Sequence, residues 1–259
     1  MMLRRYLSYL RLALVLTAAL AVAASFRLEA HLSGQHFLAR RQRVTRWFLA
    51  QIAACLPIRI TLNGAPPQHP ALWLANHVSW TDIPLLGSLA PLSFLSKADV
   101  RDWPLAGCLA REAGTLFIQR GSGDLEPVIR ELAGCLRQGH SLVIFPEGTT
   151  TDGSHLLPFH SRLLRCVTET GLPVQPVAIC YRLRGQPDTR IAPFIGEDDL
   201  LSHLDRLLRQ GQLEAEIHFL PEIETLDRNR SAVAREARDR VLQRLEQTAA
   251  ARPALNIAA

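Results

Sequence analysis

The apolar and polar positions divide this chain into two parts. Before Pro57, an uncharged apolar run covers Leu12–Phe26, and a second apolar patch recurs at helical spacing between residues 47 and 56. Beyond Pro57, short runs of consecutive apolar residues, typical of strands buried on both faces, alternate with amphipathic stretches. We therefore predict a helical leader over residues 1–57 and a single catalytic domain over residues 58–259. The domain should be an α/β fold with a mixed, largely parallel sheet flanked by helices.

The pattern also locates the main elements of the domain. Apolar runs predict strands at Arg59–Leu62, Leu72–Ala75, Ser93–Ser96, Leu116–Gln119, Leu142–Phe145, Val174–Tyr181 and Ala215–Phe219. A period of 3.6 residues predicts helices from Asp124 to Gly139, from Arg162 to Gly171, around Leu200–Leu208, and from Ser231 to Arg252. Glycine closes three of these helices, as it commonly does.

The leader has three possible interpretations, since about 20 apolar residues are needed to span a bilayer. The run Leu12–Phe26 could be a cleaved signal peptide, a signal anchor, or a helix that lies in one leaflet. Arginines follow the run at positions 27, 40, 41, 43 and 46, and positive charge favours retention on the cytoplasmic side. We therefore expect the chain at a bacterial inner membrane with its catalytic domain in the cytoplasm. The second patch is either a core-facing helix or a second membrane-contacting helix.

The composition limits the classes of ligand and partner that the chain is expected to bind. The chain has 259 residues, a net charge of +5 and five cysteines without a Cys-x-x-Cys pair. A disulfide framework or a zinc site is not expected from this cysteine pattern. The basic balance suits anionic lipid surfaces, acidic carrier proteins or nucleic acid. Nucleic acid is set aside because aromatic and basic residues do not interleave and no nucleic-acid motif is present.

Candidate chemistry lies where two predicted strands end. The segment Asn76-His77-Val78-Ser79-Trp80-Thr81-Asp82 follows the strand Leu72–Ala75, and strand ends are the usual place for sites in α/β sheets. A continuous helix would separate His77 and Asp82 by about 140°, so their contact requires a turn that enters a helix near Trp80. Asp82 could then hold one imidazole nitrogen of His77 and leave the other to accept a proton. A substrate hydroxyl could attack directly, without a Ser or Cys nucleophile.

Two further clusters supply polar groups. Phe145-Pro146-Glu147-Gly148-Thr149-Thr150 also follows a buried strand; Gly148 lets the backbone approach a ligand, and Glu147 and the threonines offer hydrogen-bonding groups. Each of these features is also compatible with a plain turn. Arg120, between a predicted strand and Gly121, could hold a phosphate or carboxylate with its planar fork or could simply be solvated. Lys97 is either a cation near the site or a surface lysine.

Together these motifs resemble the sequence blocks of the glycerolipid acyltransferase family. The blocks are Asn-His-x-Ser-Trp-x-Asp, Phe-Ile-x-Arg-Gly, Phe-Pro-Glu-Gly-Thr and a strand with Pro-Val, in this order between Leu72 and Tyr181. The family includes bacterial 1-acyl-glycerol-3-phosphate acyltransferases and their lyso-ornithine-lipid relatives. The chain is therefore identified as a member of this family.

The resemblance implies a mechanism and a set of roles. His77 corresponds to the general base that deprotonates the acceptor hydroxyl, and Asp82 to the residue that orients it. Arg120, Glu147, Gly148 and Thr149, with Lys97 as a further cation, are the expected substrate-binding residues. The acyl donor would be acyl-CoA or acyl carrier protein, with no metal and no other cofactor. The expected partners are membrane lipids and a lysolipid acceptor that enters from the bilayer.

Two departures from the family pattern bear on the acceptor. Many phosphatidate-forming members carry Arg where this chain has Thr150, and Lys where it has His160. The run from Glu147 to Gly153 is more similar to the lyso-ornithine-lipid branch. We nevertheless place 1-acyl-glycerol-3-phosphate first, with phosphatidic acid as product, and lyso-ornithine lipid second. A thioesterase that activates water with the same two residues, or a non-catalytic lipid-binding protein, remains a third possibility.

Overall fold

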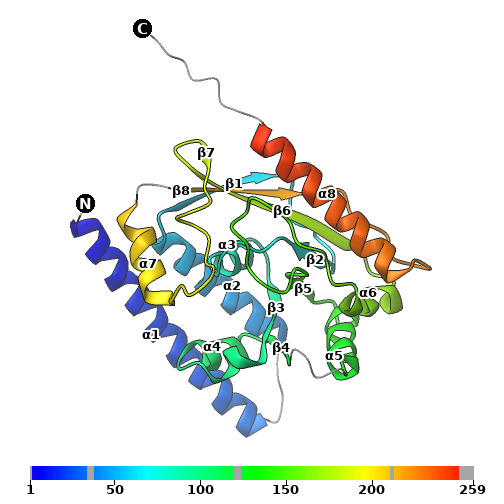
Figure 1. Ribbon diagram of the computed structural model, residues 1–259. Helices are drawn as coiled ribbons and strands as arrows, with labels where there is room; N and C mark the ends of the chain where they lie inside the picture. The colour runs from blue at the N-terminus through cyan, green and yellow to red at the C-terminus, as the bar shows by residue number, and fades with distance from the viewer. Residues whose placement is uncertain (1, 34–37, 120–123, 211–212, 251–259) are drawn as a thin grey trace.

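In the computed structural model, helices pack on both faces of one sheet and form a three-layer α/β/α fold (Figure 1). The structure describes residues 2–33, 38–119, 124–210 and 213–250. The strands are β1 (Ile58–Asn63), β2 (Leu72–Ala75), β3 (Leu92–Lys97), β4 (Leu116–Ile118), β5 (Ser141–Ile144), β6 (Val174–Leu183), β7 (Gln186–Pro187) and β8 (Leu213–Phe219). The α-helices are α1 (Met2–Ser33), α2 (Leu38–Cys55), α3 (Asp82–Leu89), α4 (Ala106–Glu112), α5 (Glu126–Arg137), α6 (Arg165–Thr170), α7 (Leu200–Arg209) and α8 (Arg230–Ala250). Short 3-10 helices cover Ala98–Asp102 and Arg162–Leu164.

The sheet is mixed and largely parallel. Its order is β1-β8-β6-β2-β5-β3-β4, and β7 pairs with β6 outside this path. β8 and β7 run antiparallel to β6, whereas β2 is parallel to both β6 and β5, and β3 is parallel to β5 and β4. The predicted fold class is therefore confirmed, and all seven predicted strands are present with ends shifted by at most two residues.

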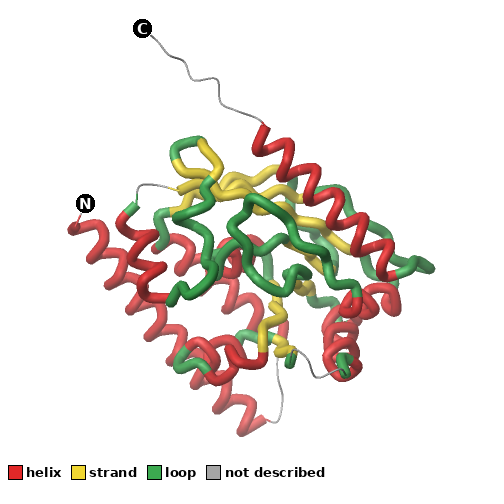
Figure 2. Tube along the Cα trace, viewed as in Figure 1, coloured by secondary structure: helices red, strands yellow, loops and turns green. Residues whose placement is uncertain are grey.

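Helices cover both faces because the central strands are apolar on consecutive residues. Every residue of β2 is buried: Leu72 and Leu74 pack with α5, α6 and α8, whereas Trp73 and Ala75 pack with α2, α3 and α7. Figure 2 shows the two groups of helices on opposite sides of the strands. Burial on both faces excludes water from the centre of the sheet. Polar side chains that could act on a substrate therefore lie at the ends of the strands.

Local signals explain several helix boundaries. The Asp199 carboxylate caps α7 by accepting hydrogen bonds from the N–H groups of Leu201 and Ser202 at 3.1 and 3.0 Å. α6 ends at Gly171, whose φ of +69° is the left-handed conformation that favours glycine. The segment between residues 98 and 112, for which no helix was predicted, forms a 3-10 helix and α4.

Residues 2–55 form two helices, separated by residues 34–37, which lie outside the described part, and both helices pack on the α/β part of the chain. α1 buries Ala19, Ala23 and Phe26, and Arg41 of α2 donates a hydrogen bond to the Phe26 carbonyl at 3.1 Å. α1 is the one helix in the described ranges that is long and apolar enough to cross a membrane. The opposite side of α1 exposes Tyr6, Leu7, Leu10, Leu14, Leu28 and Leu32. The boundary between leader and catalytic domain at residues 57 and 58 stays a prediction.

Candidate active site

The candidate site lies where the parallel strands β2 and β5 end. The loop after β2 begins with Asn76, whose side chain is buried between this loop and β6. Its Nδ2 donates to the Ile179 carbonyl at 3.0 Å, and its Oδ1 accepts from the Ile179 N–H at 2.7 Å. This pair of bonds fixes the backbone immediately before His77, because both polar groups of the amide are used.

The structure brings His77 and Asp82 together, as the sequence motif predicted. Residues 76–81 form a turn and α3 begins at Asp82, so the two side chains are not held apart by a helix. His77 Nδ1 lies 2.8 Å from Asp82 Oδ2. The same oxygen accepts the N–H groups of Val78 at 2.8 Å and Ser79 at 3.0 Å. One carboxylate oxygen therefore holds the loop and the imidazole at once.

A tyrosine that sequence analysis did not single out completes the environment of Asp82. Tyr181 Oη, on β6, donates to Asp82 Oδ1 at 2.6 Å and lies 2.7 Å from Thr81 Oγ1. Both Asp82 and Tyr181 are buried. Burial, followed by the neighbouring Asp82 charge, raises the pKa of Tyr181 well above its usual value, so the phenol keeps its proton and remains a donor.

The imidazole of His77 is fixed in orientation and partly open to solvent. Its ring stacks on Phe145 with centroids 3.9 Å apart and an interplanar angle of 13°. Its side chain is 17% exposed, whereas Asp82 is fully buried. A carboxylate can only accept, so Nδ1 carries the proton and Nε2 presents a lone pair. In the described part of the chain, Nε2 has no hydrogen-bond partner, which is the arrangement that a general base requires.

Glu147, in the segment after β5, supports the loop that carries His77. Its Oε1 accepts the N–H of His77 at 2.8 Å and its Oε2 accepts the N–H of Leu157 at 2.9 Å. Burial raises the pKa of Glu147, and the two backbone hydrogen bonds oppose that shift. Both oxygens thus have backbone partners, and in this arrangement Glu147 holds His77 in place. Its predicted contact with the acceptor stays a prediction.

The four remaining predicted substrate-binding residues lie at three different places in the chain. Gly148 has a φ of +74°, which explains the need for glycine in this turn, and Thr149 is exposed beside it. Lys97 is the last residue of β3 and is exposed at the same edge of the sheet. Arg120 lies outside the described residues.

A loop at residues 188–199 contacts Thr150, the first of the two departures from the family pattern. Thr150 Oγ1 donates to the Phe194 carbonyl at 2.5 Å, and the Phe194 N–H donates to the Val78 carbonyl at 3.0 Å. His160, the second departure from the family pattern, is exposed. Phe194 therefore connects loop 188–199 to the segments that follow β2 and β5, and the Thr150 hydroxyl is already hydrogen-bonded within the protein.

His203 on α7 fixes both this loop and the turn between β2 and α3. Its Nδ1 accepts from Trp80 Nε1 at 2.9 Å, and its Nε2 lies 3.1 and 3.0 Å from the carbonyls of Ala192 and Pro193. Burial lowers the pKa of His203, which favours the neutral ring that accepts at one nitrogen and donates at the other.

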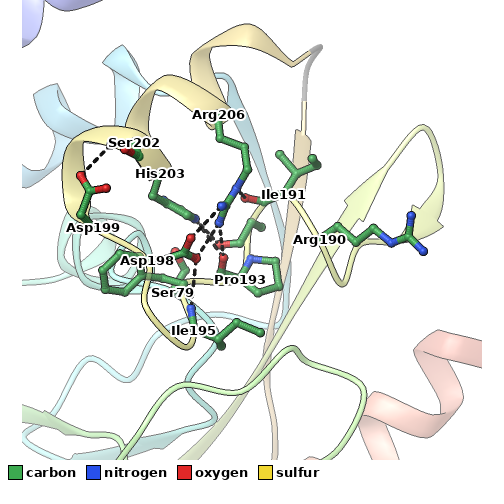
Figure 3. Close-up of polar contacts among 12 residues, drawn as sticks. Ser79, Arg190, Ile191, Pro193, Ile195, Asp198, Asp199, Ser202, His203 and Arg206 are labelled. Atoms are coloured by element: carbon green, nitrogen blue, oxygen red, sulfur yellow. Dashed lines mark hydrogen bonds and ion pairs between the residues drawn. The ribbon is translucent and has the colours of Figure 1, made fainter.

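An ion pair holds the other end of the loop. Figure 3 shows His203 and Arg206 directed from α7 toward it. Arg206 binds both oxygens of Asp198 at 2.8 Å, and this hydrogen bonding lowers the pKa of Asp198 to about 2. His203 and Arg206 were not predicted from the sequence, because they lie far along the chain from the motifs that they support.

Comparisons with known proteins agree with the motifs. Residues 58–180 match the family described as Acyltransferase. The chain is 52% identical over 248 residues to a lyso-ornithine lipid O-acyltransferase of Pseudomonas aeruginosa, with 96% of each chain covered. It is 38% identical over 133 residues to a 1-acyl-sn-glycerol-3-phosphate acyltransferase of Neisseria meningitidis, covering 50% of this chain and 52% of the relative.

A solved structure has the same fold. It is the crystal structure of the 1-acyl-sn-glycerophosphate acyltransferase PlsC from Thermotoga maritima, with a TM-score of 0.61, 20% identity, and coverage of 94% of this chain and 97% of that one. The motif order, the fold and a relative similar over nearly the whole length point to one assignment. The chain belongs to the glycerolipid acyltransferase family and is an acyltransferase.

Proposed function

We propose that this chain transfers a fatty acyl group from an acyl thioester to the free hydroxyl of lyso-ornithine lipid, with His77 as the general base. The assignment of His77 as the base rests on one observation: among the described residues its Nε2 has no hydrogen-bond partner, while its Nδ1 lies 2.8 Å from the buried carboxylate of Asp82. Membership of an acyltransferase family favours transfer over hydrolysis.

The proposed reaction needs only one proton shuttle. His77 Nε2 takes the proton of the acceptor hydroxyl while the oxygen attacks the thioester carbonyl carbon. The resulting tetrahedral intermediate collapses, the carbon–sulfur bond breaks, and the imidazolium returns its proton to the departing thiolate. Asp82 stabilises the imidazolium charge in between. The products are the acylated lipid and a free thiol, of coenzyme A or of acyl carrier protein.

The acceptor preference reverses the order expected from the sequence. A phosphate monoester carries nearly two negative charges and is best held by several cations. This chain has Thr150 in place of one of them, and that side chain is hydrogen-bonded to loop 188–199. The head group of lyso-ornithine lipid carries one carboxylate and one ammonium, so it needs fewer cations. The relative that matches over 96% of both chains is also named for lyso-ornithine lipid.

The site would operate at the membrane surface. The apolar helix α1 supports membrane association, and the arginines that follow its apolar run favour the cytoplasmic face of the inner membrane. This location gives the enzyme access to a lipid acceptor on one side and to a water-soluble thioester on the other.

Direct competition between the two lysolipids tests the proposal. Purified full-length protein is supplied with one acyl thioester and equal amounts of lyso-ornithine lipid and 1-acyl-glycerol-3-phosphate, and both products are quantified. His77→Ala serves as the control for uncatalysed acylation. We expect a preference of at least about tenfold for the ornithine acceptor, which corresponds to about 1.4 kcal/mol in transition-state binding. Preferential formation of phosphatidic acid would restore the original order, and thiol release without either product would indicate a thioesterase.

A further inference from the structure

Two loops flank the reaction centre at the same edge of the sheet. β3, β5 and β2 are parallel, so the segment that follows Lys97 at the end of β3 emerges at the edge that carries His77 and Glu147. On the other side of His77, Phe194 in loop 188–199 bonds directly to Val78 and Thr150. Each loop leads to large apolar side chains that are open to solvent. We call this set the apolar rim: Trp103, Leu105, Ile195, Leu200 and Leu201.

The first loop holds its apolar tip in a strained conformation. Leu105 has a φ of +62° and a ψ of −58°, and the Ala106 N–H donates to the Pro104 carbonyl at 2.7 Å. This is a γ-turn with positive φ, which is rare and costly for a residue with a branched side chain. The turn leaves Leu105 58% exposed and Trp103 47% exposed.

The strained loop is packed tightly against its own backbone. A Cβ atom at Gly107 would lie 2.1 Å from the Arg101 carbonyl oxygen, which leaves no room for a side chain. Arg111 Nη1 also donates to the same carbonyl at 3.0 Å. The loop is thus well ordered by its own contacts, and it exposes Trp103 and Leu105 to solvent. Burial of these two side chains would ordinarily stabilise the fold.

The second loop presents its apolar residues on a rigid support. The Asp198–Arg206 ion pair and the Asp199 cap fix the chain where it enters α7. Leu201 is 74% exposed, and it lies one helical turn before Asp205 on the same face of α7. Asp205 accepts from Tyr9 Oη at 2.8 Å and pairs with Arg5 at 2.9 Å. Leu201 therefore belongs to the side of α7 that faces α1.

A lipid leaflet is the occupant that this surface fits. α1 packs beside both α4 and α7, and its outer side carries the exposed stripe from Tyr6 to Leu32. The apolar rim thus continues a helix that is apolar enough to enter a membrane. The acceptor of a lysolipid acyltransferase is itself a lipid, whose acyl chain leaves a bilayer only at a cost of about 0.8 kcal/mol for each CH₂ group.

We propose that the apolar rim inserts into the lipid leaflet as a second membrane contact, separate from α1, and holds His77 at the depth of the lysolipid. The inference rests on the proposed function only in taking the acceptor to be a membrane lysolipid, whatever its head group. Trp103 and Leu105 enter on one side of His77, and Ile195, Leu200 and Leu201 on the other. A lysolipid can then present its hydroxyl to the base without leaving the leaflet.

The test compares full-length protein with the triple variant Trp103→Gln, Leu105→Asn, Leu201→Gln. Asparagine suits position 105 because it tolerates positive φ better than most residues. Leu226→Gln is the matched control, since Leu226 is 67% exposed but lies against Gly171 at the end of α6. α6 and α7 pack on opposite faces of the sheet. Acylation is measured with a long-chain lysolipid in vesicles of phosphatidylethanolamine and phosphatidylglycerol, and with a short-chain lysolipid that stays monomeric in water.

We expect the triple variant to lose roughly tenfold or more in acylation of the vesicle-bound acceptor, because three apolar side chains no longer enter the leaflet. Its activity on the monomeric acceptor should equal that of the native protein, and Leu226→Gln should match the native protein on both. Equal loss on both acceptors, or no loss on vesicles, would overturn the proposal. Dissociation of an oligomer by the triple variant, with vesicle activity unchanged, would make the rim a protein interface and also refute it.

A second measurement does not depend on catalysis. Brominated lipids quench tryptophans that enter the bilayer, so native protein on brominated vesicles should show a quenched component that Trp103→Phe removes. Identical quenching in the two proteins would contradict insertion of the first loop. If the native chain acylates neither lysolipid, the proposed function fails, whereas the quenching result still decides the membrane contact.

Discussion

Replacing Asp82 by asparagine should separate the charge of this residue from its structural role. Oδ2 accepts three donors, from His77, Val78 and Ser79, so an asparagine must place its oxygen there. Its NH₂ group then replaces Oδ1 and faces Tyr181 Oη, which can accept from it and turn its own proton toward Thr81, 2.7 Å away. The loop and the Nδ1–H form of His77 are preserved, and only the negative charge is lost.

The charge accounts for the expected loss of rate. Two unit charges about 4 Å apart interact by about 4 kcal/mol at an effective dielectric constant of 20, and partial solvent access to His77 reduces this value. We therefore expect the imidazolium to lose about 2–4 kcal/mol of stabilisation, which lowers kcat by about 30- to 1000-fold. Asp82→Ala should behave differently. It leaves the N–H groups of Val78 and Ser79 without their acceptor, at about 1–3 kcal/mol each.

The assay combines initial rates of thiol release in the presence of lysolipid with thermal unfolding of both variants. Asp82→Asn should keep a melting temperature close to that of the native protein and lose most of its activity, whereas Asp82→Ala should lose both. Activity of Asp82→Asn within about threefold of the native rate would show that the Asp82 charge does not assist the reaction. A melting temperature as low as that of Asp82→Ala would show that asparagine does not fit the donor set.

Three further predictions concern neighbouring residues. His77→Ala should lower turnover by about 10²- to 10⁴-fold without unfolding, and normal acyl transfer by the purified, folded variant would exclude it as the base. Tyr181→Phe should lower the free energy of unfolding by about 1.5–3 kcal/mol in denaturant titrations, because it removes a hydrogen bond to the Asp82 carboxylate; an unchanged midpoint would contradict that bond. Burial lowers the pKa of His203 in the folded protein from its usual 6.5, so His203 takes up a proton at a higher pH in the unfolded chain than in the folded one. The contribution of His203 to stability should therefore be complete above about pH 6.5 and be lost as the pH falls toward the lower folded-state pKa. His203→Gln should therefore show a shallower loss of melting temperature between pH 7.5 and 5.5, and an equal slope would assign the acid sensitivity to other groups.

The strands, the main helices and the contact between His77 and Asp82 were predictable from the sequence. Strands such as Leu72–Ala75 were predictable because a strand buried on both faces requires consecutive apolar residues, and helices such as α5 because one face follows the 3.6 period. The His77–Asp82 contact was predictable as well, since both residues lie in one short turn after a buried strand. Local patterns carry such information because the interactions involved span few residues.

The distant residues that support this turn could be identified only from the three-dimensional fold. Tyr181 is 99 residues from Asp82 and His203 is 123 residues from Trp80 along the chain, and no local period marks a residue for a partner at such a separation. Glu147 illustrates the same limit: its motif suggests a ligand contact, but its two oxygens bind backbone N–H groups of His77 and Leu157. The positions of Leu105 and Leu201 also required the fold, because an exposed leucine differs from a core leucine only in what packs against it.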